Sequence, residues 1–516
     1  MKKYLSIIIL ITIFASCKKD LDQVPISTAT TSTFYKQPSD FIQAINAVYN
    51  DLRNYPDRLM QLSEVRSDNI YPSNNDVGRD HDPINNFAPN IASNVNVEEA
   101  WRSDFNGIFR ANTLLEQIAA NGDNVGSVPL ATRLIAEAKF LRAFFYFDLV
   151  RYYGKVPIID HTVSASEAVT IARSTVADVY ALIIDDLKFA VANLPANYSG
   201  TFPSYSATDV GRATKYAAEA TLALVYMTRS GPTYSIEGAG MGLNEWNLAL
   251  PLLQDIITNG PFVFNSNQYA FTTPGGVPAT GIFSYSNQNP AYTTGNREAI
   301  FDVMYITQAG SGLGATYPWS LVPQDYFNAY GNPSTSGSLG APSVSDDLVN
   351  SYSASDTRKT PFIHTTRYGG ITEPFYRKYL DTTKVPTTNS RFDWAINFIA
   401  IRYTDILMLK AECILHGAPG SQADVDAIVN QVRARAGLTP ITNVTLAQLF
   451  DERRREFAGE GSRWFDLQRS GNLITKMNAF IAVEDAAIKK MNQVAAKDII
   501  YPVPQSQLDA APGLYN

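Results

Sequence analysis

Acidic and basic side chains crowd together near the C-terminus, where they could act on a substrate. Residues 452–469 contain the carboxylates Glu452, Glu456, Glu460 and Asp466 and the arginines Arg453, Arg454, Arg455, Arg463 and Arg469. Two carboxylates can hydrolyse a glycosidic bond when they lie about 5 Å or 6.5–9.5 Å apart. Charges beside an apolar pair such as Trp464–Phe465 more often form bidentate salt bridges that join helices. We therefore expect structural ion pairs here, with a glycosidase as the alternative, and we expect Arg142 and Asp148 to belong to the scaffold as well.

Aromatic rings and planar polar groups occur together in two other segments, and this combination suits a sugar ligand. A sugar presents C–H groups that stack on an aromatic face and hydroxyl groups that need converging donors and acceptors. Residues 67–87 contribute Asp68, Asn69, Tyr71, Arg79, His81 and Asn86. A later segment contributes Tyr285, Tyr292, Tyr317, Trp319 and Tyr326. We predict ligand contacts from both groups, with Trp319 as the main stacking surface; the alternative for each ring is packing onto the helices.

Other kinds of chemistry find little support in the composition. The histidines are four and scattered, without the spacing of a zinc site, and residues 73–82 lack the glycine and glutamate positions of an EF-hand loop. The sequence contains no dinucleotide, Walker or GxSxG motif in a suitable setting, so we expect no cofactor and no metal. Acidic residues outnumber basic ones, 49 to 42, which argues against a nucleic-acid partner.

Most of the chain has helical periodicity, so helices must position these groups. Apolar residues recur at steps of three and four in 131–152, 176–194 and 212–229, and another helix is expected to begin near Trp101. Thr175 and Asp178 have the spacing of a capping box, as do Ser421 and Asp424. Further helices are expected at 397–416, 421–436 and 446–458. Trp101, Trp246 and Trp464 lie on helical patterns, so we expect them in the core.

The helical pattern is interrupted by a segment rich in Gly, Ser, Thr, Asn, Pro and Tyr. Within it, residues 300–306 alternate as a strand would. Long ordered loops in compact proteins are usually binding elements. We predict a mainly α fold of tetratricopeptide-like helical hairpins with an aromatic, loop-rich insert. The expected parts are a signal peptide (1–16), a tether (17–33), a helical scaffold (34–260), the insert (261–396) and the completion of the scaffold with C-terminal loops (397–516).

The N-terminus has the features of an export signal. Lys2 and Lys3 precede a short apolar run and then Ala15, Ser16 and Cys17. The run is too short to span a bilayer, which takes about 20 residues. Phe-Ala-Ser-Cys resembles the lipobox of bacterial lipoproteins, in which the cysteine is acylated. We therefore predict lipidation at Cys17; the alternative is an ordinary signal peptide with an incidental cysteine.

Several segments resemble one family, the SusD/RagB outer-membrane lipoproteins of the Bacteroidota. The resemblance lies in residues 136–159, 211–231, 401–415, 452–472 and 501–507 and in the ending APGLYN, in the order that the family has them. It implies a non-catalytic protein at the cell surface that binds oligosaccharide or polysaccharide and delivers it to a TonB-dependent SusC-like transporter. Asp20 and Asp22 resemble the signal that directs such lipoproteins to the outer face of the outer membrane. It also implies that residues 452–469 are structural.

Two other functions remain open at this point. An exported helical glycoside hydrolase would use Glu456 or Glu460, and a tetratricopeptide scaffold would bind only protein. The aromatic loops favour glycan binding over a protein-only scaffold. The lack of an acid pair in a loop cleft disfavours the hydrolase.

Overall fold

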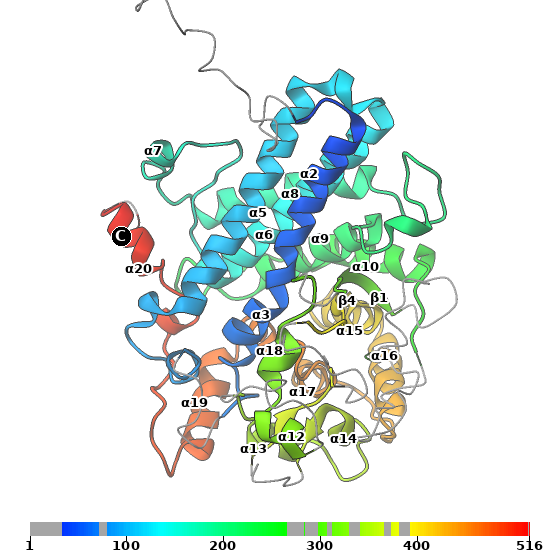
Figure 1. The fold of residues 1–516 in the computed structure, drawn as a ribbon. Helices are drawn as coiled ribbons and strands as arrows, with labels where there is room; N and C mark the ends of the chain where they lie inside the picture. The colour runs from blue at the N-terminus through cyan, green and yellow to red at the C-terminus, as the bar shows by residue number, and fades with distance from the viewer. Residues whose placement is uncertain are drawn as a thin grey trace, which may run out of the picture.

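Helices form most of the protein (Figure 1). The computed structural model describes residues 34–71, 80–265, 283, 298–306, 312–329, 341–365, 373–380, 393–513 and 515. The first helices are α2 (Pro38–Asp51), α3 (Tyr55–Leu59), α4 (Asp82–Asn85), α5 (Val95–Ala120), α6 (Val128–Tyr153), α7 (Ala165–Ala168), α8 (Val176–Asn193), α9 (Lys215–Ser230) and α10 (Trp246–Asn259). Short 3-10 or π turns occupy Leu52–Asn54, Met60–Glu64, Ile91–Ser93, Gly122–Val125, Ala207–Asp209 and Ala496–Asp498. The predicted mainly α fold is confirmed.

The long helices pack against their neighbours in sequence. Helix α2 lies on α5, α5 on α6, α6 on α8, α8 on α9 and α9 on α10, which is the arrangement of stacked helical hairpins. Close packing of α5 on α6 depends on Gly107. A Cβ atom at this position would lie 2.3 Å from the ring of Phe145, so only glycine fits. Trp101, Trp246 and Trp464 are buried, as the sequence predicts.

Side-chain caps explain where several helices begin. Thr175 accepts a hydrogen bond from the backbone N–H of Asp178, and Ser421 and Asp424 form a complete capping box, so both predicted caps are confirmed. Helix α5 begins earlier than expected, at Val95 rather than near Trp101. The reason is Asn94, whose side chain accepts from the N–H of Asn96 and caps the helix there.

A pair of antiparallel strands connects the interior of the segment that interrupts the helices to its end. Strand β1 (Ala299–Val303) lies within the segment and pairs with β4 (Phe398–Arg402), which follows it. Between them lie α11 (Tyr317–Leu321), α12 (Gln324–Ala329), α13 (Asp346–Ser351), α14 (Lys359–Phe362), β2 (Ile363–His364) and β3 (Phe375–Tyr376), the two strands being paired. These short elements are attached to the scaffold at both ends by one small sheet.

The predicted helix over 397–416 is wrong in its first turn. Residues 398–402 form strand β4, and helix α15 begins only at Tyr403. Pairing of Val303 with Phe398 and of Asp302 with Ile399 supplies these residues with backbone partners from β1. Ile399 and Ile401 are β-branched and suit a strand. The distant partner strand, which periodicity cannot reveal, therefore decides the local structure.

The scaffold resumes after β4. Its helices are α15 (Tyr403–Leu415), α16 (Gln422–Arg435), α17 (Leu446–Glu456), α18 (Arg463–Ser470), α19 (Leu473–Glu484) and α20 (Gln505–Ala510). Helix α15 packs on α10, so the chain rejoins the helical stack where it left it. The domain bounds expected from the sequence stay a prediction. Among the described helices, none is long and apolar enough to cross a membrane.

Candidate ligand-binding site

Asp68 joins the first predicted segment to the C-terminal helices. Its carboxylate is buried and receives two hydrogen bonds of 2.7 Å from the guanidinium of Arg463. Arg454 lies 3.5 Å from the same carboxylate. Burial alone would raise the pKa of Asp68, but these two arginines hold it well below its usual range. The ionised carboxylate therefore fastens residues 67–71 to α17 and α18.

Asn69 and Tyr71 are held in the same way. The Asn69 amide donates to Glu64 at 2.9 Å and accepts from Arg454 at 2.9 Å. The Tyr71 hydroxyl donates to Asp485 at 2.7 Å, and its ring packs on Phe480 of α19. All three predicted contact residues of this segment thus have protein partners and are buried. Their observed role is to position the chain that follows.

The other members of the first cluster lie around α4. Asn86 is half-buried and ends this helix, and its backbone carbonyl accepts from Asn492. His81 precedes the helix, and burial lowers the pKa of its imidazole. Arg79 lies outside the described residues. Of this cluster, Asn86 and His81 are the described members with partly accessible side chains.

The described members of the second cluster lie in or near the short helix α11 and differ in their burial. Tyr317 is fully buried, and its hydroxyl donates to the carbonyl of Asn397 at 2.9 Å. Trp319, two residues later, is half-buried. Tyr326 is buried against the rings of His364 and Phe375. Tyr285 and Tyr292 lie outside the described residues.

Backbone and side-chain contacts hold the chain in front of Trp319. Ala315 exchanges backbone hydrogen bonds of 2.7 and 3.3 Å with Trp394, and Thr316 donates to the carboxylate of Asp57 in α3. These contacts attach α11 to the scaffold on one side and to the segment before β4 on the other. An aromatic ring on such a support loses little conformational freedom on binding, which favours affinity.

The two predicted clusters contact different parts of the scaffold. Asp68, Asn69 and Tyr71 lie against α17, α18 and α19, whereas the chain around Trp319 lies against α3 and residues 394–397. The described contacts thus do not bring the clusters into one pocket.

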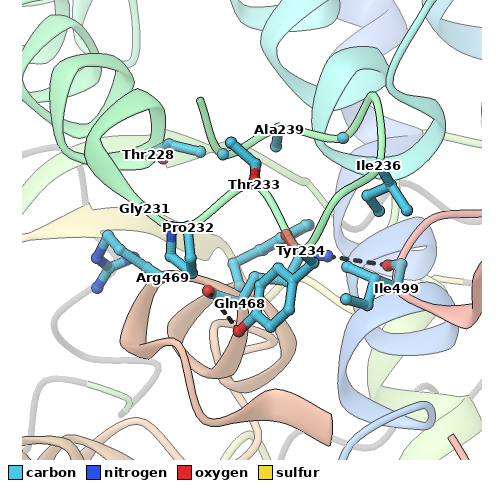
Figure 2. A pocket seen from close by; sticks show the side chains of 13 residues that line it. Thr228, Gly231, Pro232, Thr233, Tyr234, Ile236, Ala239, Gln468, Arg469 and Ile499 are labelled. Carbon is cyan, nitrogen blue, oxygen red and sulfur yellow. Dashed lines mark hydrogen bonds between the residues drawn. The ribbon is translucent and has the colours of Figure 1, made fainter. Parts of the chain in front are cut away.

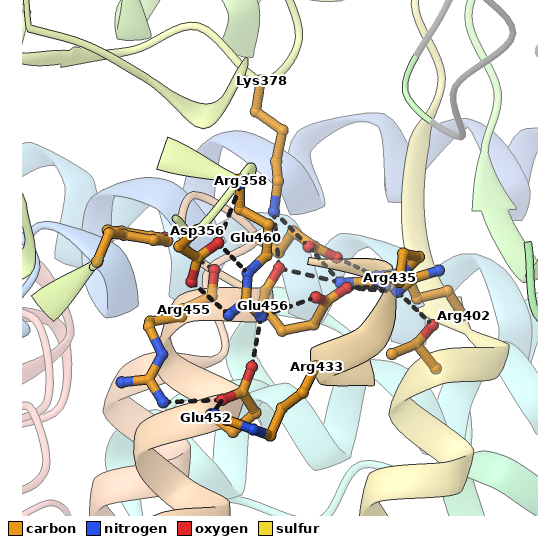
Figure 3. A network of polar contacts seen from close by, with 12 residues as sticks. Asp356, Arg358, Lys378, Arg402, Arg433, Arg435, Glu452, Arg455, Glu456 and Glu460 are labelled. Carbon is orange, nitrogen blue, oxygen red and sulfur yellow. Dashed lines mark hydrogen bonds and ion pairs between the residues drawn. The ribbon is translucent and has the colours of Figure 1, made fainter. Parts of the chain in front are cut away.

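Glu452, Glu456 and Glu460 of the charged segment 452–469 lie in a network of polar contacts (Figure 3) and are buried. Glu456 is 0% exposed and accepts from Arg402 at 2.9 Å, from Arg435 at 2.6 Å and from Arg358 at 3.2 Å. Arg358 precedes α14, whereas Arg402 ends β4 and Arg435 ends α16. One carboxylate therefore joins the insert to two parts of the scaffold, as expected for structural ion pairs.

Glu460, which follows the end of α17, completes this network. It accepts from Arg402 at 2.8 Å and from Lys378 at 2.6 Å. Burial lowers the pKa of Lys378 to about 8, although the ion pair with Glu460 opposes this shift. The oxygens of both buried carboxylates are bound by arginine and lysine side chains. The arrangement of Glu456 and Glu460 is that of a structural core.

The enclosed cavity beneath residues 231–240 is too small for a ligand (Figure 2). Its volume is about 10 Å³, the space of a single water molecule. Tyr234 closes one side, and its hydroxyl donates to the carbonyl of Gln468 at 3.0 Å. This cavity is a place for structural water.

An open groove that the sequence analysis did not predict lies between α2, residues 208–212 and the end of β1. Its volume is about 310 Å³. Asn46 and Asn50, one helical turn apart on α2, line one wall. Exposed asparagines in an amphipathic helix carry no periodic signal, and the opposite wall of the groove comes from residues far along the chain. The spacing of Asn46 and Asn50 by one helical turn is the only sequence feature that could have indicated the groove.

Comparisons with known proteins assign this helical stack with its loop-rich insert to the SusD-like proteins. A family model described as "SusD family" matches residues 371–516. A second, described as "Starch-binding associating with outer membrane", matches residues 20–227. The chain belongs to the SusD/RagB family.

Similar proteins are known in several Bacteroidota. The "SusD-like protein P2" of Formosa agariphila is 26% identical over 547 residues, which cover 98% of this chain and 97% of that protein. The structure of surface glycan-binding protein A from Bacteroides uniformis has a TM-score of 0.73 at 22% identity and covers 93% of this chain and 100% of its own. Surface glycan-binding protein A from Bacteroides thetaiotaomicron, solved in complex with laminarihexaose, has a TM-score of 0.71 at 22% identity and covers 93% and 98%.

Proposed function

We propose that this protein is a lipoprotein, anchored through Cys17 on the outer face of the outer membrane, that binds an oligosaccharide or polysaccharide. It does not cleave the glycan but delivers it to a TonB-dependent SusC-like transporter. The observation that carries the proposal is the fold, which is shared over nearly the whole chain with a protein solved in complex with laminarihexaose. The description of the matching N-terminal family model, starch binding in association with the outer membrane, supports it.

The proposed ligand contacts centre on Trp319. Its half-buried ring lies on a support that is hydrogen-bonded to α3 and to residue 394. Asn86, Arg79, Tyr285 and Tyr292 supply further contacts, while Asp68, Asn69 and Tyr71 hold residues 67–71 and Tyr317 holds α11. Several contacts are needed, because micromolar affinity corresponds to about 8 kcal/mol. One aromatic stack adds only about 0.5–1.5 kcal/mol beyond its burial.

The surroundings of two carboxylates support the absence of cleavage. Glu456 and Glu460, the residues that a hydrolase would use, are buried and bound to arginine and lysine. Neither can protonate a glycosidic oxygen without breaking the network that joins the insert to the scaffold. The proposal therefore assigns these residues to stability.

Calorimetry with the full chain in detergent tests the proposal against laminarin, laminarihexaose and starch oligosaccharides. We expect binding of at least one glycan without release of reducing ends, and a Trp319→Ala variant that binds about tenfold more weakly. Phe109→Ala is the control, since Phe109 is an exposed ring (50%) on α5. A chain that binds no glycan, or that cleaves one, contradicts the proposal; normal affinity in Trp319→Ala removes only that residue from the site.

A further inference from the structure

The open groove beside α2 has the dimensions of a ligand site. It lies between the C-terminal half of α2, the turn at residues 208–212 and residues 302–304, which include the end of β1; α2 and β1 can be followed in Figure 1. Its volume of about 310 Å³ falls within the range of small-molecule sites, about 300–1,000 Å³. Three separate elements of the fold thus build one depression.

Two amides on α2 are oriented by arginines. Arg212 donates to the side-chain oxygen of Asn46 at 2.7 Å, and Arg53 donates to that of Asn50 at 3.2 Å. Arginine only donates hydrogen bonds, so each amide must turn its oxygen to the arginine and its NH₂ group away from it. Among the described residues, neither NH₂ group has an acceptor. The groove therefore presents two fixed donors, about one helical turn apart.

An aromatic ring lies between these donors in the sequence. Tyr49 lines the groove and is half-buried. Its position is fixed, because its hydroxyl accepts from the backbone N–H of Ala213 at 2.9 Å and the guanidinium of Arg212 lies 5.6 Å from the ring centre. An aromatic surface beside hydrogen-bond donors is the combination that a sugar ring requires.

The charges of the lining favour an uncharged ligand. Arg53 and Arg212 are balanced by Asp209 and Asp302. Both arginines are also occupied: Arg212 pairs with Glu137 at 2.8 Å and Asp209 at 3.1 Å, and Arg53 donates to the carbonyl of Gly314 at 3.2 Å. An anion would meet a lining without net positive charge, whereas hydroxyl groups would find the two amide donors.

We infer that this groove is a second glycan-binding site, specific for neutral sugars. Asn46 and Asn50 donate to hydroxyl oxygens of the ligand, and Tyr49 packs against its C–H groups. The inference rests on the proposed function for the class of ligand. It adds a site that lies on α2 and is built by residues other than those around Trp319.

Replacing each amide by its acid separates ligand binding from a structural role. Asn46→Asp and Asn50→Asp keep an oxygen for the arginine but lose the NH₂ donor. Gln43→Glu is the matched control, because it makes the same change on α2 at an exposed residue outside the groove. Calorimetry of the full chain with laminarihexaose and maltohexaose, and with an oligogalacturonate as acidic probe, gives the affinities.

In a fit with two sites, we expect the groove to bind the neutral hexasaccharide about three- to tenfold more weakly in each single variant and at least about tenfold more weakly in the double variant, while the site around Trp319 keeps its affinity. Gln43→Glu should bind as the wild type does, the oligogalacturonate should not bind in the groove, and the melting temperature should not fall. A double variant whose isotherm is the same as that of the wild type overturns the inference and leaves the proposed function intact, provided that the wild type binds. If the wild type binds neither hexasaccharide, the proposed function and the inference fail together.

Discussion

The hydroxyl group of Thr316 donates a hydrogen bond to the carboxylate of Asp57, which lies 259 residues earlier in the chain. Asp57 belongs to α3, and Thr316 immediately precedes the α11 helix that carries Trp319. Burial raises the pKa of Asp57 to about 6, although the Thr316 hydrogen bond and the charge of Arg58 favour ionisation. The support of the proposed stacking ring therefore contains a carboxyl group that titrates near neutral pH.

Replacing Asp57 by asparagine should change how stability depends on pH. Since the folded-state pKa is raised, Asp57 stabilises the wild type below its ordinary pKa of about 4 and loses this contribution as the pH rises through about 6. Relative to wild type, Asp57→Asn should therefore gain about 1 kcal/mol of unfolding free energy between about pH 5 and pH 7.5. Urea unfolding at both pH values measures this, and a pH-independent difference contradicts the assignment.

Tyr317→Phe should affect stability rather than ligand binding. The change removes the hydrogen bond to the carbonyl of Asn397 and leaves the ring in contact with Tyr379. We expect a loss of about 1 kcal/mol of unfolding free energy, the usual value for one hydrogen bond. The affinity for the glycan that the wild type binds should stay the same. A loss as large as that of Trp319→Ala would place Tyr317 in the site itself.

Glu456→Gln should be among the most destabilising single changes in this protein. It removes the negative charge shared by Arg358, Arg402 and Arg435, and breaking a buried ion pair costs about 3–5 kcal/mol. Glu99→Gln is the control: Glu99 pairs with Arg102 on the surface, where such pairs contribute at most about 1 kcal/mol. Chemical unfolding compares the two variants. Similar stability of both would show that the network contributes little.

Cys17→Ser tests the anchor. Without the thiol, no acyl chain can be attached, and each buried methylene group of such a chain contributes about 0.8 kcal/mol to membrane binding. We expect the wild type to incorporate labelled palmitate and to sediment with the outer membrane. The variant should incorporate none. Equal palmitate labelling of wild type and variant would contradict lipidation at this residue.

Local signals predicted much of the helical scaffold. Thr175 and Ser421 begin helices where the sequence places them, because a cap depends only on residues a few positions away. Strand β4 was missed, because its partner β1 lies about a hundred residues earlier. Local information also explains why residues 452–469 could be interpreted as structural: charged groups beside apolar rings already favour ion pairs.

The candidate site was harder to predict. Tyr317 and Trp319 have similar composition around them, yet one is buried and the other half-buried. Tyr317 turns inward onto the carbonyl of Asn397 and the rings of Tyr379 and Phe398. The amides of Asn46 and Asn50 are oriented by hydrogen bonds from Arg212 and Arg53. Arg212 lies in a different segment of the chain. Such orientation depends on tertiary contacts that composition does not contain.

The two-pronged contact between Asp68 and Arg463 spans 395 residues. During translation, Arg463 is therefore added long after Asp68, when most of the chain has already been synthesised. Until that moment the carboxylate has to remain in water, because an unpaired charge cannot be buried cheaply. A chain cut anywhere between these two residues would lack one partner of the pair, so we expect neither piece to reach its native packing alone.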